Sequence, residues 1–581
     1  MASDLNQRQS AETDESTLRQ TVYSVERNAE KSDEKSDEKS VETDFTLDSI
    51  LDRIGHFGRF QAIVFVLICV PMTFNAIDSV TYVFTASTVV HRCNITECDT
   101  ATSQYYEPWT DFTIPSQGDD LSRCFRYSSS LDDNATWPEH GNVCYPQNFE
   151  TYKTARCRSD NLIFLNKEVT IANEFGIFCA DDWKLSLVGS INNVGQFFGI
   201  PLGGFISDKF GRSTSLALGG FLGAIFGIIR SLSPNYLFFV VFEFLDNLAS
   251  SALYPTCFIV GIELIGPKRR VIACSMITIF YAVGEILLAL IAKYYQNWRV
   301  LLRILYIPAL VHFAYFWILP ESVRWLLSQQ QADRAKAILK RAAAFNKRKL
   351  SDHSLQKLVQ DNRNKLQSAN EAKFPIKTAF HKFHWRIANC SFCWIVNVLV
   401  YFGLSVNSVL LGGDKYNNFM FTALVEIPGF LLPYLIMDRI GRRFSLFLFM
   451  LVSGICCLGT VFTGPNDDYL KLTCFLTGKL AITASFQVLY FFTSEIFPTS
   501  LRNSLLSFCS MVGRFGSMIA PLTPLLARYN QSAPALLFAC AALISAALAL
   551  LFPETTNSVL PATIQEADDI GAQKKKKNEA S

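Results

Sequence analysis

Long apolar stretches recur along most of the chain, and short polar segments separate them. A helix needs about 20 mostly apolar residues to cross a bilayer. The pattern predicts twelve spans, over 58–83, 184–206, 214–232, 235–262, 269–293, 297–319, 386–410, 415–437, 444–464, 467–493, 503–527 and 532–552. We therefore expect an all-α polytopic membrane protein with twelve transmembrane helices.

The polar segments divide the chain into regions. We predict a disordered cytoplasmic tail over 1–55, six helices over 56–319, a cytoplasmic linker with amphipathic helices over 320–385, six further helices over 386–552, and a cytoplasmic tail over 553–581. The first tail contains "EKSDEKSDEKS", a low-complexity run that cannot bury a core. The linker either lies on the membrane surface or locks the two groups of helices together.

Composition supports a membrane protein and argues against several other classes. Charged residues are 18% of the chain, below the roughly 25% of soluble domains. A net charge of +2 gives no case for nucleic-acid binding. Because G-x-S-x-G, H-E-x-x-H and phosphate-cradling motifs are absent from the sequence, we expect neither an enzyme nor a cofactor or metal site.

Basic residues set the expected orientation. "SDKFGRS", "GPKRR", "DRIGRR" and the segment 324–386 all fall on one side of the predicted spans. The excess of Lys and Arg in short loops marks the cytoplasmic side, so both termini are expected there. No apolar stretch starts the chain, so we expect no cleavable secretory signal. The tail "KKKK" either contacts anionic lipid or stays in solvent.

A long polar loop over about 91–182 is then expected outside the cell. Six cysteines lie in it: Cys93, Cys98, Cys124, Cys144, Cys157 and Cys179. Asn94 and Asn134 begin glycosylation sequons. An oxidising compartment favours up to three disulfides, with fifteen pairings open. The alternative, a zinc site, needs short paired spacings, and only Cys93 and Cys98 come close.

A motif occurs twice. "GGFISDKFGRS" follows the second predicted span, and "YLIMDRIGRRFS" follows the eighth. A duplicated six-span unit is typical of one large transporter architecture. The charges in these motifs either latch the cytoplasmic side shut or only anchor the loops. Gly204 in the first copy is expected to permit a close helix contact.

With these repeats the chain resembles the major facilitator superfamily. "PESVRWLL", "SEIFPTSLRN" and "FPETTNSVLPATI", together with the large cysteine-rich loop, resemble the organic cation/anion/carnitine transporter family. The resemblance implies a plasma-membrane transporter of two six-helix halves that moves small organic ions by alternating access. It also implies gating roles for Asp208, Lys209, Gly211, Arg212, Asp438, Arg439, Gly441, Arg442, Arg443, Glu321, Arg324, Glu495, Arg502 and Glu554.

Charged residues also lie inside predicted spans, where each costs roughly 2.5–3.5 kcal/mol. They are Asp78, Glu243, Asp246, Glu285, Glu426, Lys479 and Arg514. Such residues usually face a cavity or a partner. Lys479 is expected nearer a span end, where its side chain can reach the interface. A departure from the family is Phe242, which stands where relatives usually have a basic residue.

Arg514, in "CSMVGRFGSMIAP", has two interpretations. It either pairs with an acid such as Asp78, Glu285 or Glu426, or it receives a substrate carboxylate in a central cavity. The neighbouring glycines are expected to open room around it. The resemblance favours the second interpretation, because anion and carnitine transporters of the family have arginine here and cation transporters have aspartate. We therefore predict a carboxylate-bearing anion or zwitterion as substrate.

A zwitterion also needs a site for its cationic end. Aromatic faces attract quaternary ammonium by roughly 0.5–2 kcal/mol each. With Arg514, the expected substrate-binding set is Tyr401, Tyr254, Phe258, Phe486, Tyr490, Asn75, Asp78 and Glu426. The alternative for each aromatic is plain packing, since the chain has 48 Phe. A co-transported ion is a possible further partner; the oligomeric state stays open.

Two other functions stay open at this point. One is an organic cation transporter with altered selectivity. The other is a receptor or scaffold that keeps the fold without transport, against which the intact repeats and the retained charge of Arg514 argue.

Overall fold

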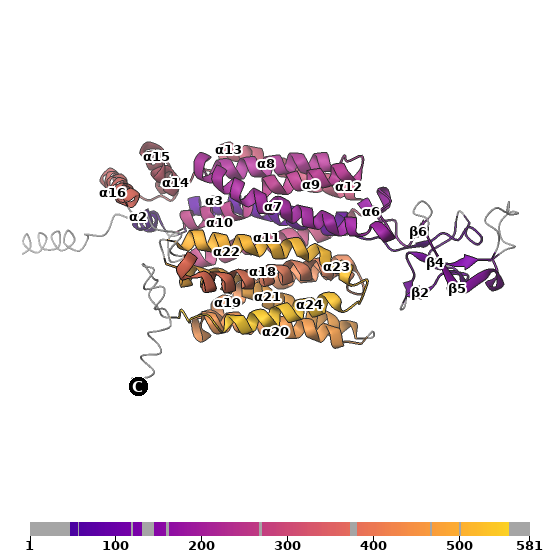
Figure 1. Cartoon of the computed structure of the whole chain (residues 1–581). Helices are drawn as coiled ribbons and strands as arrows, with labels where there is room; N and C mark the ends of the chain where they lie inside the picture. Colours follow the sequence, from indigo (N-terminus) through magenta and orange to yellow (C-terminus); the bar gives the residue numbers. More distant parts are fainter. Residues whose placement is uncertain are drawn as a thin grey trace, which may run out of the picture.

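The computed structural model describes residues 47–556, except 56, 101, 118–119, 131–143, 158–161, 266–269, 372–379, 465–466 and 499–500. Long helices lie side by side in one bundle (Figure 1). The strands gather beyond one end of this bundle, called the strand end below. Beyond the opposite end, called the linker end, lie the helices α2 (Leu47–Ile54), α14 (Val323–Ser328), α15 (Ala332–Phe345) and α16 (Asp352–Glu371).

The bundle has two groups of helices. The first half contains α3 (Arg59–Val80), α4 (Tyr82–Thr85), α7 (Trp183–Phe210), α8 (Arg212–Arg230), α9 (Tyr236–Ser250), α10 (Leu253–Leu264), α11 (Arg270–Tyr294), α12 (Trp298–Ala309), η4 (Leu310–Ala314) and α13 (Tyr315–Ile318). The second half contains α18 (His384–Asn407), η5 (Ser408–Leu410), α19 (Lys415–Ile440), α20 (Arg442–Phe462), α21 (Asp468–Ile496), α22 (Arg502–Ile519), η6 (Ala520–Leu522), α23 (Thr523–Leu526) and α24 (Ala533–Ala549).

In the described part of the chain, ten helices are long and apolar enough to cross a membrane. The helices α7 and α24 lie in the same bundle (Figure 1), which is consistent with the twelve spans expected. Several predicted spans are interrupted: the fourth divides at Ser251 and Ala252, the sixth passes through the 3-10 segment Leu310–Ala314, and the eleventh changes helix type at Ala520. Pro521 and Pro524 account for the interruption of the eleventh span, because each lacks the N–H that continues a helix.

The linker end holds a small helical cluster of its own, formed by α2 (Leu47–Ile54), α14 (Val323–Ser328), α15 (Ala332–Phe345) and α16 (Asp352–Glu371). Residues 47–54 thus differ from the disordered tail predicted to residue 55. The physical reason is a short apolar stripe, since Leu47, Ile50, Leu51 and Ile54 are buried against the cluster. The same cluster buries Leu339 of α15, so this apolar face is covered by protein.

The predicted cysteine-rich loop folds into short antiparallel pairs. The strand β1 (His91–Cys93) pairs with β6 (Leu162–Phe164), β2 (Ser116–Gln117) with β3 (Asp120–Leu121), and β4 (Phe125–Ser129) with β5 (Phe149–Arg156). The short helices α5 (Thr110–Thr113) and η1 (Pro146–Asn148) lie between strands, and α6 (Ile171–Glu174) and η2 (Cys179–Asp181) follow the last strand before α7. We call this unit the Cys-rich module.

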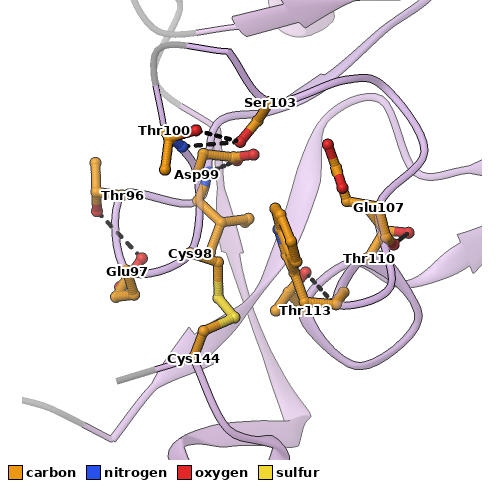
Figure 2. The surroundings of a disulfide bond; sticks show 12 residues. Thr96, Glu97, Cys98, Asp99, Thr100, Ser103, Glu107, Thr110, Thr113 and Cys144 are labelled. Carbon is orange, nitrogen blue, oxygen red and sulfur yellow. Dashed lines mark hydrogen bonds between the residues drawn. A yellow bond between two sulfur atoms is a disulfide. The ribbon is translucent and has the colours of Figure 1, made fainter. Parts of the chain in front are cut away.

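Three disulfides hold the Cys-rich module together, as the sequence led us to expect. They join Cys93 to Cys157, Cys98 to Cys144, and Cys124 to Cys179. Figure 2 shows the Cys98–Cys144 bond beside a hydrogen-bonded turn. Within that turn, Asp99 accepts two hydrogen bonds from the buried guanidinium of Arg92, at 2.7 and 2.6 Å. A module with a small core gains most of its rigidity from such cross-links.

Candidate functional site

Arg514 points into the bundle from α22. Its Nη1 donates a hydrogen bond to Oε1 of Gln196 on α7, at 3.1 Å, so the contact joins the two halves. The hydroxyl groups of Tyr254, Tyr281 and Tyr490 lie within electrostatic range of the guanidinium. These side chains come from three further helices. Arg514 is therefore surrounded by protein groups of both halves.

The structure does not support an acid partner for Arg514. Among the described residues no carboxylate forms an ion pair with it, so Asp78, Glu285 and Glu426 are not its partners. The expectation about the glycines is corrected as well. A Cβ on Gly516 would lie 2.2 Å from the carbonyl oxygen of Ile395, so this glycine allows α22 to pack against α18. The guanidinium keeps an unused charge and donors for a bidentate ligand.

A buried ion pair lies in the second half. The Lys479 ammonium is 2.8 Å from the Glu426 carboxylate, and both side chains are fully buried. Tyr401 donates a hydrogen bond to Glu426 at 2.7 Å, and its ring lies 3.5 Å below the ammonium. The placement of Lys479 near a span end is thus corrected. Because α21 extends from Asp468, residue 479 lies well inside the helix.

Glu285 reaches this ion pair from the first half. It lies on α11, which packs against α19, and its carboxyl group is within hydrogen-bonding reach of Glu426. Its side chain is buried, and its Oε1 atom has no hydrogen-bond partner. Two carboxyl groups thus meet at the contact between the halves, with Lys479 as their neighbour.

A second buried charge cluster lies in the first half. Arg230 of α8 pairs with Glu243 and lies 3.3 Å from Asp246, and all three side chains are fully buried. Tyr306 accepts a hydrogen bond from Arg230 at 2.9 Å and donates one to Asp246 at 2.6 Å. Gly227 permits this arrangement, since a Cβ there would lie 2.1 Å from the Tyr306 ring.

Arg230 is the residue that sequence reasoning missed. It supplies the buried cation whose absence at Phe242 was noted as a departure from the family. The available signal was its position near Glu243 and Asp246, two acids on the next predicted span. However, Arg230 stands at the end of a predicted span, and this position predicts a side chain at the membrane interface and not a buried one.

Hydrogen bonds connect the first-half cluster to Arg514. Gln196 donates to Asn192 at 3.1 Å, and Asn192 donates to Glu243 at 2.7 Å. Asp78 lies near Arg230 and Tyr306 in the same cluster. The predicted substrate residue Asp78 is therefore part of a structural cluster. Asn75, also in the predicted set, donates to the Ser250 carbonyl at 3.2 Å.

The aromatic candidates fall into two groups. Phe486 and Tyr490 contact the Trp394 ring, with centroids 5.6 and 4.7 Å away. Tyr254 and Phe258 stack on each other at 6.3 Å. All four side chains are only partly buried, in contrast to the buried Tyr401. Tyr254 lies within electrostatic range of both Arg514 and Glu426.

The repeated motif near the linker end has a clear local function in the first half. Gly211, at φ +105°, ends α7 and lets the chain turn directly into α8. Glu321 then accepts the N–H of Arg212 at 2.8 Å, so a distant carboxylate caps the start of α8. Arg212 also pairs with Asp208 at 2.6 Å and approaches Glu263 at 4.0 Å.

The second half repeats this arrangement. Gly441, at φ +93°, ends α19, and Glu554 accepts the N–H of Arg442 at 3.0 Å. Arg442 pairs with Asp438 at 3.1 Å and with Glu495 at 3.3 Å. Glu263 therefore corresponds to Glu495, a match that the sequence motifs did not reveal. Each network lies within one half, so neither joins the halves at the linker end.

The remaining predicted gating residues have local contacts. Lys209 lies over the rings of Phe205 and Phe210, and Arg443 over that of Phe444. Arg324 pairs with Asp48 of α2. Burial lowers the pKa of Arg502, which lies outside the apolar span of α22. Arg439 is exposed.

The close helix contact expected at Gly204 is made by its neighbour instead. Gly204 has open space around it, whereas a Cβ on Gly203 would meet the Cβ of Ala252.

Ion pairs do join the halves at the strand end. Lys415 of α19 is 2.6 Å from Glu168 of the Cys-rich module. Arg528 pairs with Asp182, and Lys293 is 2.9 Å from Asp414. Burial raises the pKa of Asp182, and Arg528 opposes this shift. We call these three ion pairs the strand-end clasp.

Comparisons with known proteins decide the family. The "Sugar (and other) transporter" family model matches residues 128–564. An organic cation transporter protein of Drosophila melanogaster is 30% identical over 527 residues, covering 89% of this chain and 94% of the relative. The chain belongs to the organic cation and carnitine transporter family, a branch of the major facilitator superfamily. It is a multi-pass membrane transporter of this type.

Other relatives in this transporter family do not separate the substrate classes. Solute carrier family 22 member 3 of Rattus norvegicus is 30% identical over 537 residues, covering 90% of this chain and 95% of the relative. Organic cation/carnitine transporter 2 of Homo sapiens is 28% identical over 540 residues, covering 90% and 94%. The names of these relatives favour transport over catalysis.

Solved structures agree on the fold. The proton:xylose symporter XylE, with 6-bromo-6-deoxy-D-glucose bound, aligns with a TM-score of 0.53 at 18% identity, covering 68% of this chain and 93% of that one. An inward-open form of XylE from E. coli gives 0.52 at 17% identity, with 68% and 90% covered. At this identity the likeness shows the major facilitator fold alone.

Proposed function

We propose that this transporter moves small organic ions that carry a carboxylate and a cationic group, as carnitine does. The observation that carries the proposal is the unpaired guanidinium of Arg514 in a bundle interior that also holds buried carboxyl groups. Among the residues that the structure describes, Gln196 is the hydrogen-bond partner of Arg514. Arginine binds carboxylate with two parallel hydrogen bonds and keeps its charge at every physiological pH.

The other end of such a substrate needs an acidic and aromatic environment. Glu426 and Glu285 supply carboxyl groups, and the Tyr401 ring lies beside them. Tyr254 and Tyr281 lie within electrostatic range of both Arg514 and Glu426. The presence of a cationic and an acidic group near the same aromatic side chains supports a zwitterion over a dianion.

Transport is proposed to follow alternating access in the plasma membrane. The Cys-rich module, with its disulfides, suits the oxidising outside of the cell, and the basic linker suits the cytoplasm. The strand-end clasp then joins the halves on the outer side. In this account, the structure is closed to the outside, and the clasp must break before substrate enters.

The test is uptake of labelled L-carnitine, tetraethylammonium and succinate by cells that display the full chain at their surface. The proposal predicts uptake of L-carnitine well above that of succinate. Uptake of succinate alone would favour an anion transporter. If no probe enters while the protein is at the surface, the receptor or scaffold alternative gains support.

An organic cation transporter is the second candidate. Its support is the excess of buried acids, since Glu285, Glu426, Asp78, Glu243 and Asp246 outnumber Lys479 and Arg230. The same assay separates the two candidates, because a cation transporter takes up tetraethylammonium in preference to L-carnitine.

A further inference from the structure

Glu285 lies at the contact between the halves with a carboxyl oxygen that nothing satisfies. Its side chain is 1% exposed, and Oε1 has no hydrogen-bond partner. Among the described residues no cation forms an ion pair with it. Its carboxyl group lies within hydrogen-bonding reach of the Glu426 carboxyl group. An ionised carboxylate in such a place would be a buried, unpaired charge, which is costly.

Two carboxyl groups in contact require a proton. Neither an ionised Glu285 nor an ionised Glu426 has a hydrogen to donate, so a hydrogen bond between them forms only when one is protonated. Adjacent buried carboxylates repel each other and do not both stay ionised. The contact between α11 and α19 therefore holds one proton when no other cation is present.

The neighbouring groups fix the charge balance. Lys479 lies 2.8 Å from Glu426, and the Tyr401 hydroxyl donates to Glu426 at 2.7 Å. The hydroxyls of Tyr281, on α11, and Tyr82, on α4, lie within electrostatic range of Glu285. With one shared proton, the two carboxyl groups carry one negative charge, which Lys479 neutralises. A second cation keeps the cluster neutral only if the proton leaves.

We propose that Glu285 and Glu426 hold a shared proton in the empty site and release it when the cationic group of a substrate binds. The ammonium group forms ion pairs with both carboxylates. The O–H bond breaks, its electrons stay on the carboxylate oxygen, and the proton passes to water. The exchange takes place between helices of different halves, where their relative movement would open or close the contact. This inference rests on the proposed function and adds proton exchange to it.

The experiment uses the purified full chain in detergent, in weak buffer with a pH indicator. Adding L-carnitine or tetraethylammonium at pH 7 should release about one proton per molecule bound. Succinate, which has no cationic group, should release none. By linkage, the affinity for tetraethylammonium should rise about tenfold for each pH unit over which the pair is protonated.

A conservative variant tests the residue. Glu285→Gln keeps a side chain that can donate a hydrogen bond to Glu426 but carries no titratable proton. It should bind tetraethylammonium without proton release and with an affinity that does not change with pH. Asp246→Asn is the matched control, because Asp246 is an equally buried acid outside the pair. This control should release the proton as the wild type does.

Several results would overturn the inference. One is a wild type that binds a probe without releasing a proton, and another is a Glu285→Gln variant that still releases one. A third is the loss of proton release in Asp246→Asn. The last is proton release that disappears when N-methylglucamine replaces sodium. This last result would show that a sodium ion, and not the cationic group of the substrate, displaces the proton. If Glu285→Gln does not fold, a flat pH dependence of wild-type affinity is enough to reject the inference. A protein that binds no probe at any pH would contradict the proposed function itself.

Discussion

Arg230 stabilises the first half as the cation that three buried acids share. It pairs with Glu243, lies 3.3 Å from Asp246, and is near Asp78. A buried pair contributes little net stability, but removing one member leaves an uncompensated charge. Arg230 is thus required by its neighbours, even though its own burial is unfavourable.

Replacing this arginine should be severe. Arg230→Leu should lower the free energy of unfolding by about 3–5 kcal/mol, because the acids stay buried without a partner. Thermal unfolding of the purified chain in detergent measures this. Arg303→Leu is the control, since Arg303 is exposed on α12. Equal melting temperatures for both variants would contradict the account. Adding Glu243→Leu to Arg230→Leu should restore part of the loss.

At the residue scale, the sequence reveals a conspicuous charge but not the ordinary residue that contacts it. The charge of Arg514 stands out in an apolar run, but its partner Gln196 is a neutral residue with no signal in the sequence. The depth of Lys479 depends on where α21 begins, and such helix ends are uncertain from sequence. The disulfide content followed from the cysteine count, whereas the pairing required the fold.

At the scale of elements, the two glycine turns fix how consecutive helices join at the linker end. Gly211 and Gly441 both have positive φ, and each brings a distant glutamate onto the first N–H groups of the next helix. The sequence repeat predicted the matching charges. The capping carboxylates Glu321 and Glu554 could not be assigned to these caps from sequence, because they lie more than a hundred residues away along the chain.

Alanine at such a turn should destabilise the protein. Gly441→Ala would place a Cβ 2.7 Å from the Glu554 carboxylate and force a non-glycine residue to positive φ. The expected cost is about 1–3 kcal/mol in the free energy of unfolding. Gly204→Ala is the matched control, since nothing lies within 4 Å of its Cβ. Thermal unfolding that ranks the two variants equally would refute the capping role.

For the whole molecule, the strand-end clasp joins the Cys-rich module and the first half to the second half. Glu168 and Asp182 face Lys415 and Arg528, respectively. The disulfide between Cys124 and Cys179 anchors the chain close to Asp182. The Cys-rich module is thus connected to the movement of the halves. The hydropathy pattern predicted the helix bundle. The strand-end clasp could not be predicted, because a contact between a loop and a distant helix leaves no periodic pattern in the sequence.

Breaking one clasp should loosen the strand end. Lys415→Ala removes a partly buried ion pair worth about 1 kcal/mol. Hydrogen–deuterium exchange at the first turn of α19 should therefore become faster. Lys471→Ala, which removes a strand-end lysine on α21, is the control and should leave that turn unchanged. An unaltered exchange rate in Lys415→Ala would show that the clasp does not hold the halves together.

The central claim is that Arg514 receives the substrate carboxylate. The most direct measurement is the ratio of L-carnitine to tetraethylammonium uptake in wild type, Arg514→Ala and the exposed control Arg334→Ala, at equal surface expression. Losing charge-assisted hydrogen bonds worth about 1.5–3 kcal/mol should lower the ratio about 10- to 100-fold in Arg514→Ala alone. An unchanged ratio in Arg514→Ala would contradict the account.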